Sequence, residues 1–355
     1  MDEWSLVILT LLVLILPSFR QVFFRKNDKT ENVVVTERLV FFDILRGIAI
    51  IAVILIHVTF FFTHTTNLVN NNFFINVVNN IARFAIPFFF ICSGVLLNPI
   101  KNKKELKAFY SRKLVRIVLP YFFVTMFLYF ANPVAIKTLL FQLLTGKAAP
   151  PFYFVLVLIQ MYLLYPLLSR WRYKKWFLPG MFFASLIYFI SPLPEQPFGF
   201  PIFLPFLFLF CYGMYYRDRF LNYKADKQEI FIWIMIIVAD LLIMIWGQEY
   251  YYNQRYFYGP ALFNVLFFFR AGIMKQKWFS NFLLAFGKNS LWIFLVHFPL
   301  MAVTYPYYYI FNLNYYLTFF LCFIVSLGTS YLLARICQLL YDYGIERVKI
   351  RGTKI

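Results

Sequence analysis

The chain has 355 residues, of which 62% are hydrophobic, 23% aromatic and only 14% charged. Soluble domains are about half apolar and about a quarter charged, so this composition excludes a set of soluble domains and predicts one continuous membrane domain. The net charge of +19 would favour a nucleic-acid partner in a soluble protein, but the basic residues here lie between apolar runs, so we expect no such partner.

Apolar segments recur along the whole chain, and a helix that crosses a bilayer needs about 20 mostly apolar residues. In chain order, the eleven candidate spans are 4–19, 42–64, 81–98, 115–132, 152–168, 177–191, 201–216, 230–247, 257–273, 289–311 and 315–340. Three of them are short, and we expect these to be tilted, bent or partly re-entrant: 152–168, 177–191 and 201–216. The predicted fold is an all-α polytopic membrane protein with about 11 transmembrane helices.

The loop charges predict the orientation of these spans. Alternate loops hold 29 Lys and Arg residues, whereas the opposite set of loops holds only four. The basic set comprises segments 20–38, 101–116, 170–175, 217–227, 270–288 and 335–354. Because positively charged loops stay in the cytoplasm, we expect the N-terminus outside and the C-terminus inside. The first span begins with acidic residues and lacks a cleavage site, so we expect it to persist as an accessory helix.

The cysteines show no pattern of metal ligands or disulfide partners. All four fall in apolar stretches: Cys92, Cys211, Cys322 and Cys337. We expect buried thiols, and we predict neither a disulfide nor a structural metal.

Few ionisable residues lie inside the spans. Each costs at least about 2.5 kcal/mol on insertion scales, which makes it a functional candidate by default. They are Asp43, Arg46, His57, Asp240 and His297, with Arg83, Glu249 and His64 near the outer edges. Arg46 and His57 are eleven residues apart, which places them on one helical face and about 16 Å apart along the axis. Asp43 is expected to fix the Arg46 side chain, three residues further on.

This face carries an anion anchor at its inner end and a base deep in the membrane. Arg46 is a permanent cation whose planar donors suit phosphate or carboxylate. Histidine is the side chain best able to remove a hydroxyl proton near neutral pH, which suits His57 to act as a base. A long donor could place its charged head at Arg46 and its reactive end near His57. The structural alternative is an arginine that reaches the headgroups and a histidine bonded to a neighbouring helix.

Five sequence motifs follow one another along the chain. The first is Asp-x-Leu-Arg-Gly with a histidine eleven residues after the arginine, formed by Asp43, Leu45, Arg46, Gly47 and His57. The second motif is Phe-Ala-Ile-Pro-Phe-Phe-Phe-Ile-Cys-Ser-Gly at 84–94, and the third is the basic stretch 109–120, which ends in proline. The fourth is Phe-Tyr-Phe…Tyr…Tyr-Pro at 152–166, and the fifth is Gly-Lys-Asn-Ser…His-Phe-Pro at 287–299. In this order the motifs resemble those of the membrane-bound acyltransferase 3 family, over residues 38–340. Phe152 stands where the family often has tryptophan.

The resemblance implies both a domain organisation and a reaction. Members commonly form a ten-helix bundle, so residues 1–37 would be an accessory helix and linker, 38–340 the membrane domain, and 341–355 a basic cytoplasmic tail. Members are multi-pass enzymes of the bacterial cytoplasmic (inner) membrane that acylate, most often O-acetylate, surface glycans, lipids or antibiotics. The implied donor is acyl-CoA, with acetyl-CoA as the expected form. The implied acceptor is a hydroxyl of a cell-surface glycan or lipid-linked sugar.

Within this resemblance, three residues are candidates for catalysis. His57 would remove the proton of the acceptor hydroxyl, or would take the acyl group itself. Asp240, expected at a similar depth, would orient the His57 ring, with a structural hydrogen bond as the alternative. His297 would polarise the thioester carbonyl or brace a neighbouring helix.

Two further groups of residues are candidates for binding. Four basic residues near the inner surface would hold the CoA phosphates, unless they are ordinary inner-loop charge. They are Arg46, Arg112, Lys113 and Arg116. The candidates for binding the acceptor are Arg83, Ser93 and Tyr153. Arg83 has headgroup anchoring as its alternative, and Ser93 has close packing between helices together with Gly94.

Two other functions remain open from the residues alone. A transporter or flippase for a glycan or lipid-linked sugar also fits a multi-span bundle with intramembrane Arg and His, although the sequence shows no inverted repeat. A sensor or scaffold without chemistry is the third reading. The expected partners are the lipid bilayer and the implied glycan or lipid-linked sugar acceptor, and the sequence leaves the oligomeric state open.

Overall fold

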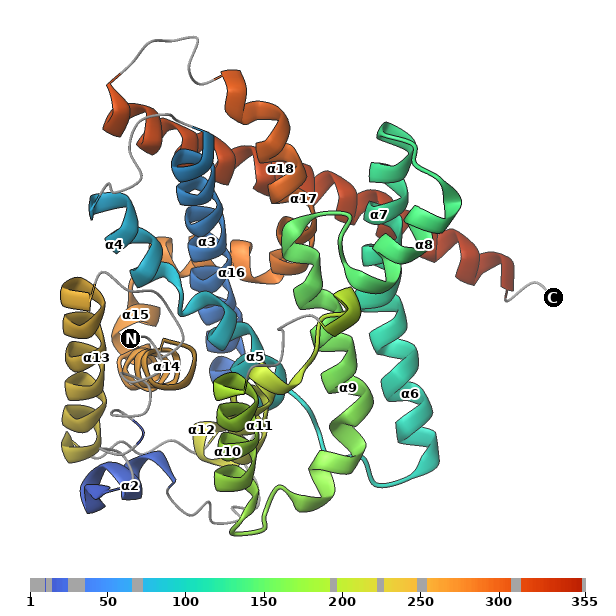
Figure 1. Cartoon of the computed structure of the whole chain (residues 1–355). Coiled ribbons are helices and arrows are strands. Elements are labelled where there is room, and N and C mark those ends of the chain that lie inside the picture. Colours follow the sequence, from blue (N-terminus) through green and yellow to red (C-terminus); the bar gives the residue numbers. More distant parts are fainter. Residues whose placement is uncertain are drawn as a thin grey trace.

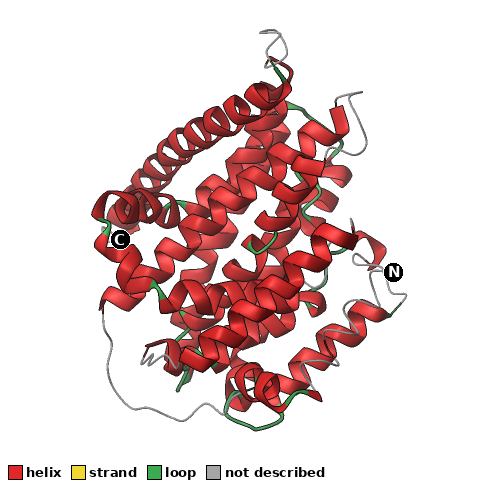
Figure 2. Ribbon diagram, turned by 90° about the vertical axis from the view of Figure 1, so that its left-hand side faces the viewer, coloured by secondary structure: helices red, strands yellow, loops and turns green. Residues whose placement is uncertain are grey.

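The protein is a bundle of helices (Figures 1 and 2). The computed structural model describes residues 10, 15–24, 36–65, 73–191, 197–221, 227–247, 254–307 and 314–352, and no strand occurs among these residues. The α-helices are α2 (Pro17–Phe23), α3 (Thr36–Thr65), α4 (Phe73–Ala82), α5 (Ala85–Val95), α6 (Lys103–Lys113), α7 (Leu119–Ala131), α8 (Ile136–Thr145), α9 (Tyr153–Trp171), α10 (Phe177–Ile190), α11 (Leu207–Tyr215), α12 (Arg217–Leu221), α13 (Lys227–Gly247), α14 (Gly259–Phe268), α15 (Arg270–Lys275), α16 (Lys277–Lys288), α17 (Ser290–Thr304) and α18 (Tyr315–Gly352). Short 3₁₀ or π segments are η1 (Leu114–Val118), η2 (Pro150–Phe152), η3 (Pro197–Gly199), η4 (Leu204–Phe206) and η5 (Gln254–Tyr258).

Several of these helices are suited to a bilayer. Six described stretches are long and apolar enough to cross one: Leu39–Thr63, Phe73–Val95, Lys103–Ala131, Pro150–Trp171, Ser290–Tyr307 and Tyr315–Glu346. Four apolar helices are shorter: Ile136–Thr145, Phe177–Tyr188, Leu204–Tyr215 and Tyr256–Phe268. Large apolar side chains stay exposed on the outside of the bundle, and on α7 they include Phe122, Phe123, Phe127 and Phe130. Such a surface is suited to lipid, and the chain is a multi-pass membrane protein.

The predicted spans can be compared with the helices one by one. Each predicted span from 42–64 onward falls on a helix, and the spans expected to be short at 177–191 and 201–216 are the short helices α10 and α11. The third span expected to be short, 152–168, is not, because it lies in the 22-residue apolar stretch Pro150–Trp171. The predicted first span, 4–19, lies almost entirely outside the described residues. Helix α18 continues to Gly352, so most of the basic tail predicted from residue 341 is part of this helix.

Two segments predicted as basic loops are helical instead. Segment 101–116 forms α6 and continues through η1 into α7, and segment 270–288 forms α15 and α16. Helix α6 begins where the Asn102 side chain accepts a hydrogen bond of 2.8 Å from the backbone N–H of Glu105. The prediction was wrong because hydropathy locates long apolar runs, whereas the helices α6 and α16 contain many polar residues.

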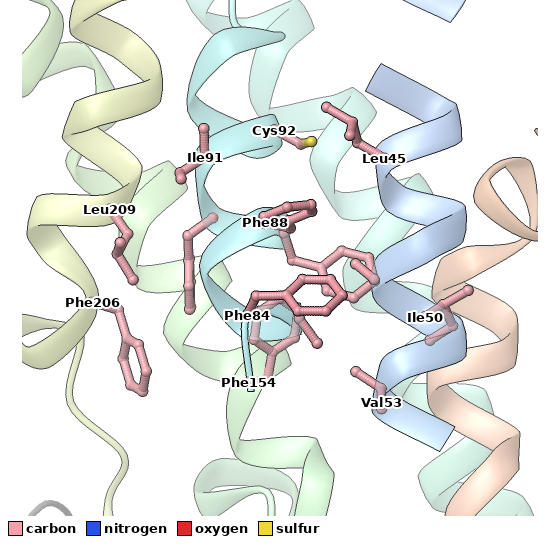
Figure 3. Close-up of a cluster of buried hydrophobic side chains, with 14 of the residues drawn as sticks. Leu45, Ile50, Val53, Phe84, Phe88, Ile91, Cys92, Phe154, Phe206 and Leu209 are labelled. Carbon is pink, nitrogen blue, oxygen red and sulfur yellow. The ribbon is translucent and has the colours of Figure 1, made fainter. Parts of the chain in front are cut away.

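Helix α5 lies between α3 and α11 (Figure 3). Cys92 points from α5 toward Leu45 of α3, and Ile91 points toward Leu209 of α11. All four side chains are fully buried. The two sides of α5 thus form one apolar core with its neighbours.

Reciprocal glycines bring α5 and α11 into backbone contact. A Cβ atom on Gly94 would overlap the carbonyl oxygen of Phe210, and a Cβ atom on Gly213 would overlap that of Ile91. Small residues allow this approach between helices in a membrane. The close packing considered for the Ser93–Gly94 pair is confirmed for Gly94.

Helices α3 and α16 meet in the same way. A Cβ atom on Gly47 would overlap the carbonyl oxygen of Leu283, and one on Gly287 would overlap that of Asp43. The glycine of the first sequence motif therefore packs against the glycine of the last. The sequence did not predict this contact, because segment 270–288 was expected to be a loop.

We expect Gly287→Ala to lower the free energy of unfolding by about 1–3 kcal/mol, because its methyl group would collide with the α3 backbone. Gly328→Ala in α18 is the matched control, since a Cβ atom there meets nothing within 4 Å. Alanine favours helix over glycine, so the control should be as stable as wild type or slightly more so. The melting temperature of detergent-purified protein measures the difference. Equal melting temperatures for the two variants would contradict the packing.

Candidate functional site

Helix α3 carries both residues of the Arg46–His57 pair. It runs without a break from Thr36 to Thr65, so the two side chains lie on one helix and about 16 Å apart along its axis. Arg46 Nη1 donates a 2.7 Å hydrogen bond to Asp43 Oδ1, as the sequence predicted. About a third of each of these side chains stays exposed, at 31% and 29%. Arg46 therefore remains accessible to a bound anion.

A cavity of about 1000 Å³ lies between α3, α5, α6, α9, α17 and α18. Five cations line this basic cavity: Arg46, Arg112, Lys113, Arg116 and Lys288. The first four are the residues predicted to bind the donor: Arg46 lies on α3, and the other three lie together on α6 and η1. Glu105 and Asp342 also line the cavity, so positive charge is in excess. The cavity is thus suited to a polyanion.

Aromatic side chains form part of the cavity wall. The Lys113 ammonium lies 3.8 Å from the centroid of the Tyr162 ring, which is a cation–π contact. The Tyr341 hydroxyl donates to the carbonyl oxygen of Val115, which ties α18 to η1. Among the lining residues, Arg112, Arg116 and Lys288 are exposed, whereas Phe89 and Leu158 are buried. The cavity therefore changes from charged at its mouth to apolar at its inner end.

Two other basic segments, 170–175 and 217–227, meet beside the cavity. Arg217 donates a 2.6 Å hydrogen bond to the side chain of Asn98, which lines the cavity. Asp218 accepts hydrogen bonds from Tyr173 at 2.8 Å and from Arg172 at 3.3 Å. These two segments, far apart in the sequence, therefore lie together near Asn98 of the cavity.

His57 and His297 form a pair of neighbouring rings. Their centroids are 5.1 Å apart, with 44° between the ring planes. His297 is fully buried, whereas His57 retains some exposure. His297 Nδ1 lies 3.1 Å from the carbonyl oxygen of Ile293 and 2.8 Å from that of Phe294. A carbonyl can only accept, so we assign the proton to Nδ1; Nε2 then carries a lone pair and has no partner among the described residues.

The same two sequence motifs form both the glycine contact and the histidine pair. Ten residues separate Gly47 from His57, and ten separate Gly287 from His297. Because the glycines meet at one level and the histidines at another, α3 and the α16–α17 segment run side by side in the same direction. The first and the last sequence motifs therefore pack against each other at two places, the glycines and the histidines.

The structure does not bring Asp240 to His57. Helix α13, which carries Asp240, packs mainly against α2, α4, α14 and η5. Among the described residues, the titratable groups that interact electrostatically with His57 are those of His297 and Arg83. Both carboxylate oxygens of Asp240 are buried without a hydrogen-bond partner among the described residues. The predicted equal depth of Asp240 and His57 in the membrane did not make them neighbours, because depth does not determine the order of the helices around the bundle.

The three candidates for acceptor binding lie in different surroundings. Arg83, in the turn between α4 and α5, interacts electrostatically with His57. Ser93 lines the basic cavity. Tyr153, at the start of α9, does not line it, and its ring lies 6.4 Å from that of Phe206. Glu249 and the side chain of His64 lie outside the described residues.

Sequence reasoning missed Lys288 as a cavity residue and the pairing of the two histidines. Lys288 directly follows Gly287 in the last motif, but it was counted with the charges of an expected loop. The signal that could have found the histidine pair is the ten-residue interval that occurs in both motifs. In the part of the chain that the structure describes, no group of three His, Cys, Asp or Glu side chains could hold a metal ion.

Comparison with known proteins identifies the family. Residues 39–335 match the model of a family described as an acyltransferase domain, which spans well over half of the chain. No curated protein and no solved structure matches the chain. The matched region contains the basic cavity residues from Arg46 to Lys288 as well as both histidines. The chain therefore belongs to the acyltransferase 3 family that its motifs resemble.

Proposed function

We propose that this protein transfers an acyl group, expected to be acetyl, from cytoplasmic acyl-CoA to a hydroxyl of a cell-surface glycan or lipid-linked sugar. The observation that carries the proposal is the basic cavity, whose inner end approaches the His57–His297 pair. By the positive-inside rule its basic mouth faces the cytoplasm, in the inner membrane of a bacterium.

The donor phosphates would bind at the mouth of the cavity. Acyl-CoA carries its negative charge at one end and its thioester at the other. The guanidinium groups of Arg46 and Arg116 suit phosphate, and the Lys288 ammonium adds a compact charge from the opposite helix. Anchoring the charged end there points the thioester toward the inner, apolar end.

The proton transfer would be carried out by His57. Its unprotonated nitrogen removes the proton of the acceptor hydroxyl while the hydroxyl oxygen attacks the thioester carbon. The new C–O bond forms, the C–S bond breaks, and the imidazolium returns the proton to the departing sulfur. His297 would support this step, because its Nε2 lone pair can accept the N–H of His57 and hold the ring in one tautomer.

The acceptor would approach His57 from the side of Arg83. Arg83 interacts with His57 and does not line the basic cavity, so donor and acceptor would reach the histidine from different directions. Two separate entrances suit a reaction whose donor is cytoplasmic and whose product is on the surface.

We expect His57→Gln to lower kcat for acyl transfer by about 10²–10⁴-fold, the usual contribution of a general base. Acyl-CoA should still bind, since the cations of the cavity are intact. The assay follows thioester loss and transfer of labelled acetyl to an envelope extract by protein in lipid vesicles. A folded His57→Gln protein with wild-type turnover would remove His57 from the mechanism.

We expect Lys288→Gln to raise KM for acyl-CoA about ten-fold with little change in kcat, because a charged hydrogen bond to the donor is lost. Lys277→Gln is the matched control, at the other end of the same helix and outside the cavity lining. Equal effects of the two substitutions on KM would mean that the cavity does not hold the donor phosphates.

A further inference from the structure

Three phenylalanine rings line the buried part of the basic cavity. Phe89, Phe154 and Phe294 come from α5, α9 and α17, and all three line the cavity. The ring of Phe154 lies 5.0 Å from that of Phe294 and 5.7 Å from that of Phe89. All three side chains are buried. We call these three rings the aromatic layer.

The histidine pair lies next to Phe294 of this layer. The ring of Phe294 is 5.7 Å from that of His297, which in turn is 5.1 Å from that of His57. Neither histidine lines the basic cavity. In this state of the protein, the rings therefore separate the space for the donor from the groups that would perform the proton transfer.

Any acyl group that reaches His57 from the cavity must pass between these rings. Protein interiors are close-packed, so a larger group requires a larger displacement of the neighbouring side chains. The ring of Phe154 also packs against that of Phe90, 4.9 Å away, and this contact further restricts its movement. A small acyl group needs little displacement, whereas a long chain needs the layer to open.

We propose that the aromatic layer of Phe89, Phe154 and Phe294 selects donors with short acyl groups by limiting what can pass from the basic cavity to His57. This inference rests on the proposed function, because it concerns the donor of that reaction. The layer also keeps cytoplasmic water from the histidines when no donor is bound.

The test compares acetyl-CoA with hexanoyl-CoA as donors for purified protein in lipid vesicles. Phe294→Ala removes one ring of the layer and keeps the backbone carbonyl that accepts the His297 Nδ1–H. Phe154→Leu is a milder second variant in case the first does not fold. Phe182→Ala is the control, because this buried ring packs 5.1 Å from that of Phe208, does not line the cavity and contacts no ring of the layer among the described residues.

We expect Phe294→Ala and Phe154→Leu to raise the ratio of kcat/KM for hexanoyl-CoA over acetyl-CoA about ten-fold or more. The control should keep the wild-type ratio. Unchanged ratios in both layer variants, with acetyl transfer retained, would overturn the selection. If wild type transfers no acyl group from either donor, the proposed function fails, and the donor selection fails with it.

A second measurement tests the layer without relying on turnover. Diethyl pyrocarbonate modifies accessible histidines, and peptide mass spectrometry locates the modified residue. His297 is fully buried, so it should react slowly in wild type and in Phe182→Ala. It should react several-fold faster in Phe294→Ala. An equal rate in all three proteins would show that the rings do not separate the cavity from the histidines.

Discussion

The backbone contact of α3 with α16 positions the residues on which the proposed reaction depends. Gly47 and Gly287 each lie against the other helix, where any side chain would collide with a carbonyl group. Arg46 precedes the first glycine and Lys288 follows the second, so the contact places one cation from each helix at the same cavity. One helical interval further on, the same two segments bring His57 against His297.

In this site the cations and the histidines proposed to transfer the proton lie in separate places, an arrangement that suits a membrane protein. The cations lie where the cavity opens, so they remain partly hydrated until a bound polyanion displaces the water. The histidines lie in the packed interior, where an imidazole can stay neutral and accept a proton. The aromatic layer between them would let the acyl group cross while water stays outside. A donor that is charged at one end and reactive at the other matches this arrangement.

Local features of this site were predictable, and long-range ones were not. The Arg46–His57 spacing follows from helix geometry, and the ion pair of Asp43 with Arg46 follows from their separation by three residues. The pairing of His57 with His297 depends on the order of helices around the bundle, which hydropathy does not contain. Asp240 shows the same limit, because its predicted depth agreed with that of His57 while its helix packs elsewhere. The helix that carries Lys288 was hidden because it is too polar to read as a span.

The most direct test of the central claim is a structure of the protein with an analogue of acetyl-CoA in which a methylene group replaces the thioester sulfur, so that no transfer occurs. The account predicts the phosphates of the analogue beside Arg46, Arg116 and Lys288, with its carbonyl group at the rings of Phe154 and Phe294 and pointing toward His57. A bound analogue whose phosphates lie away from these cations, or an empty cavity at saturating analogue, would contradict it.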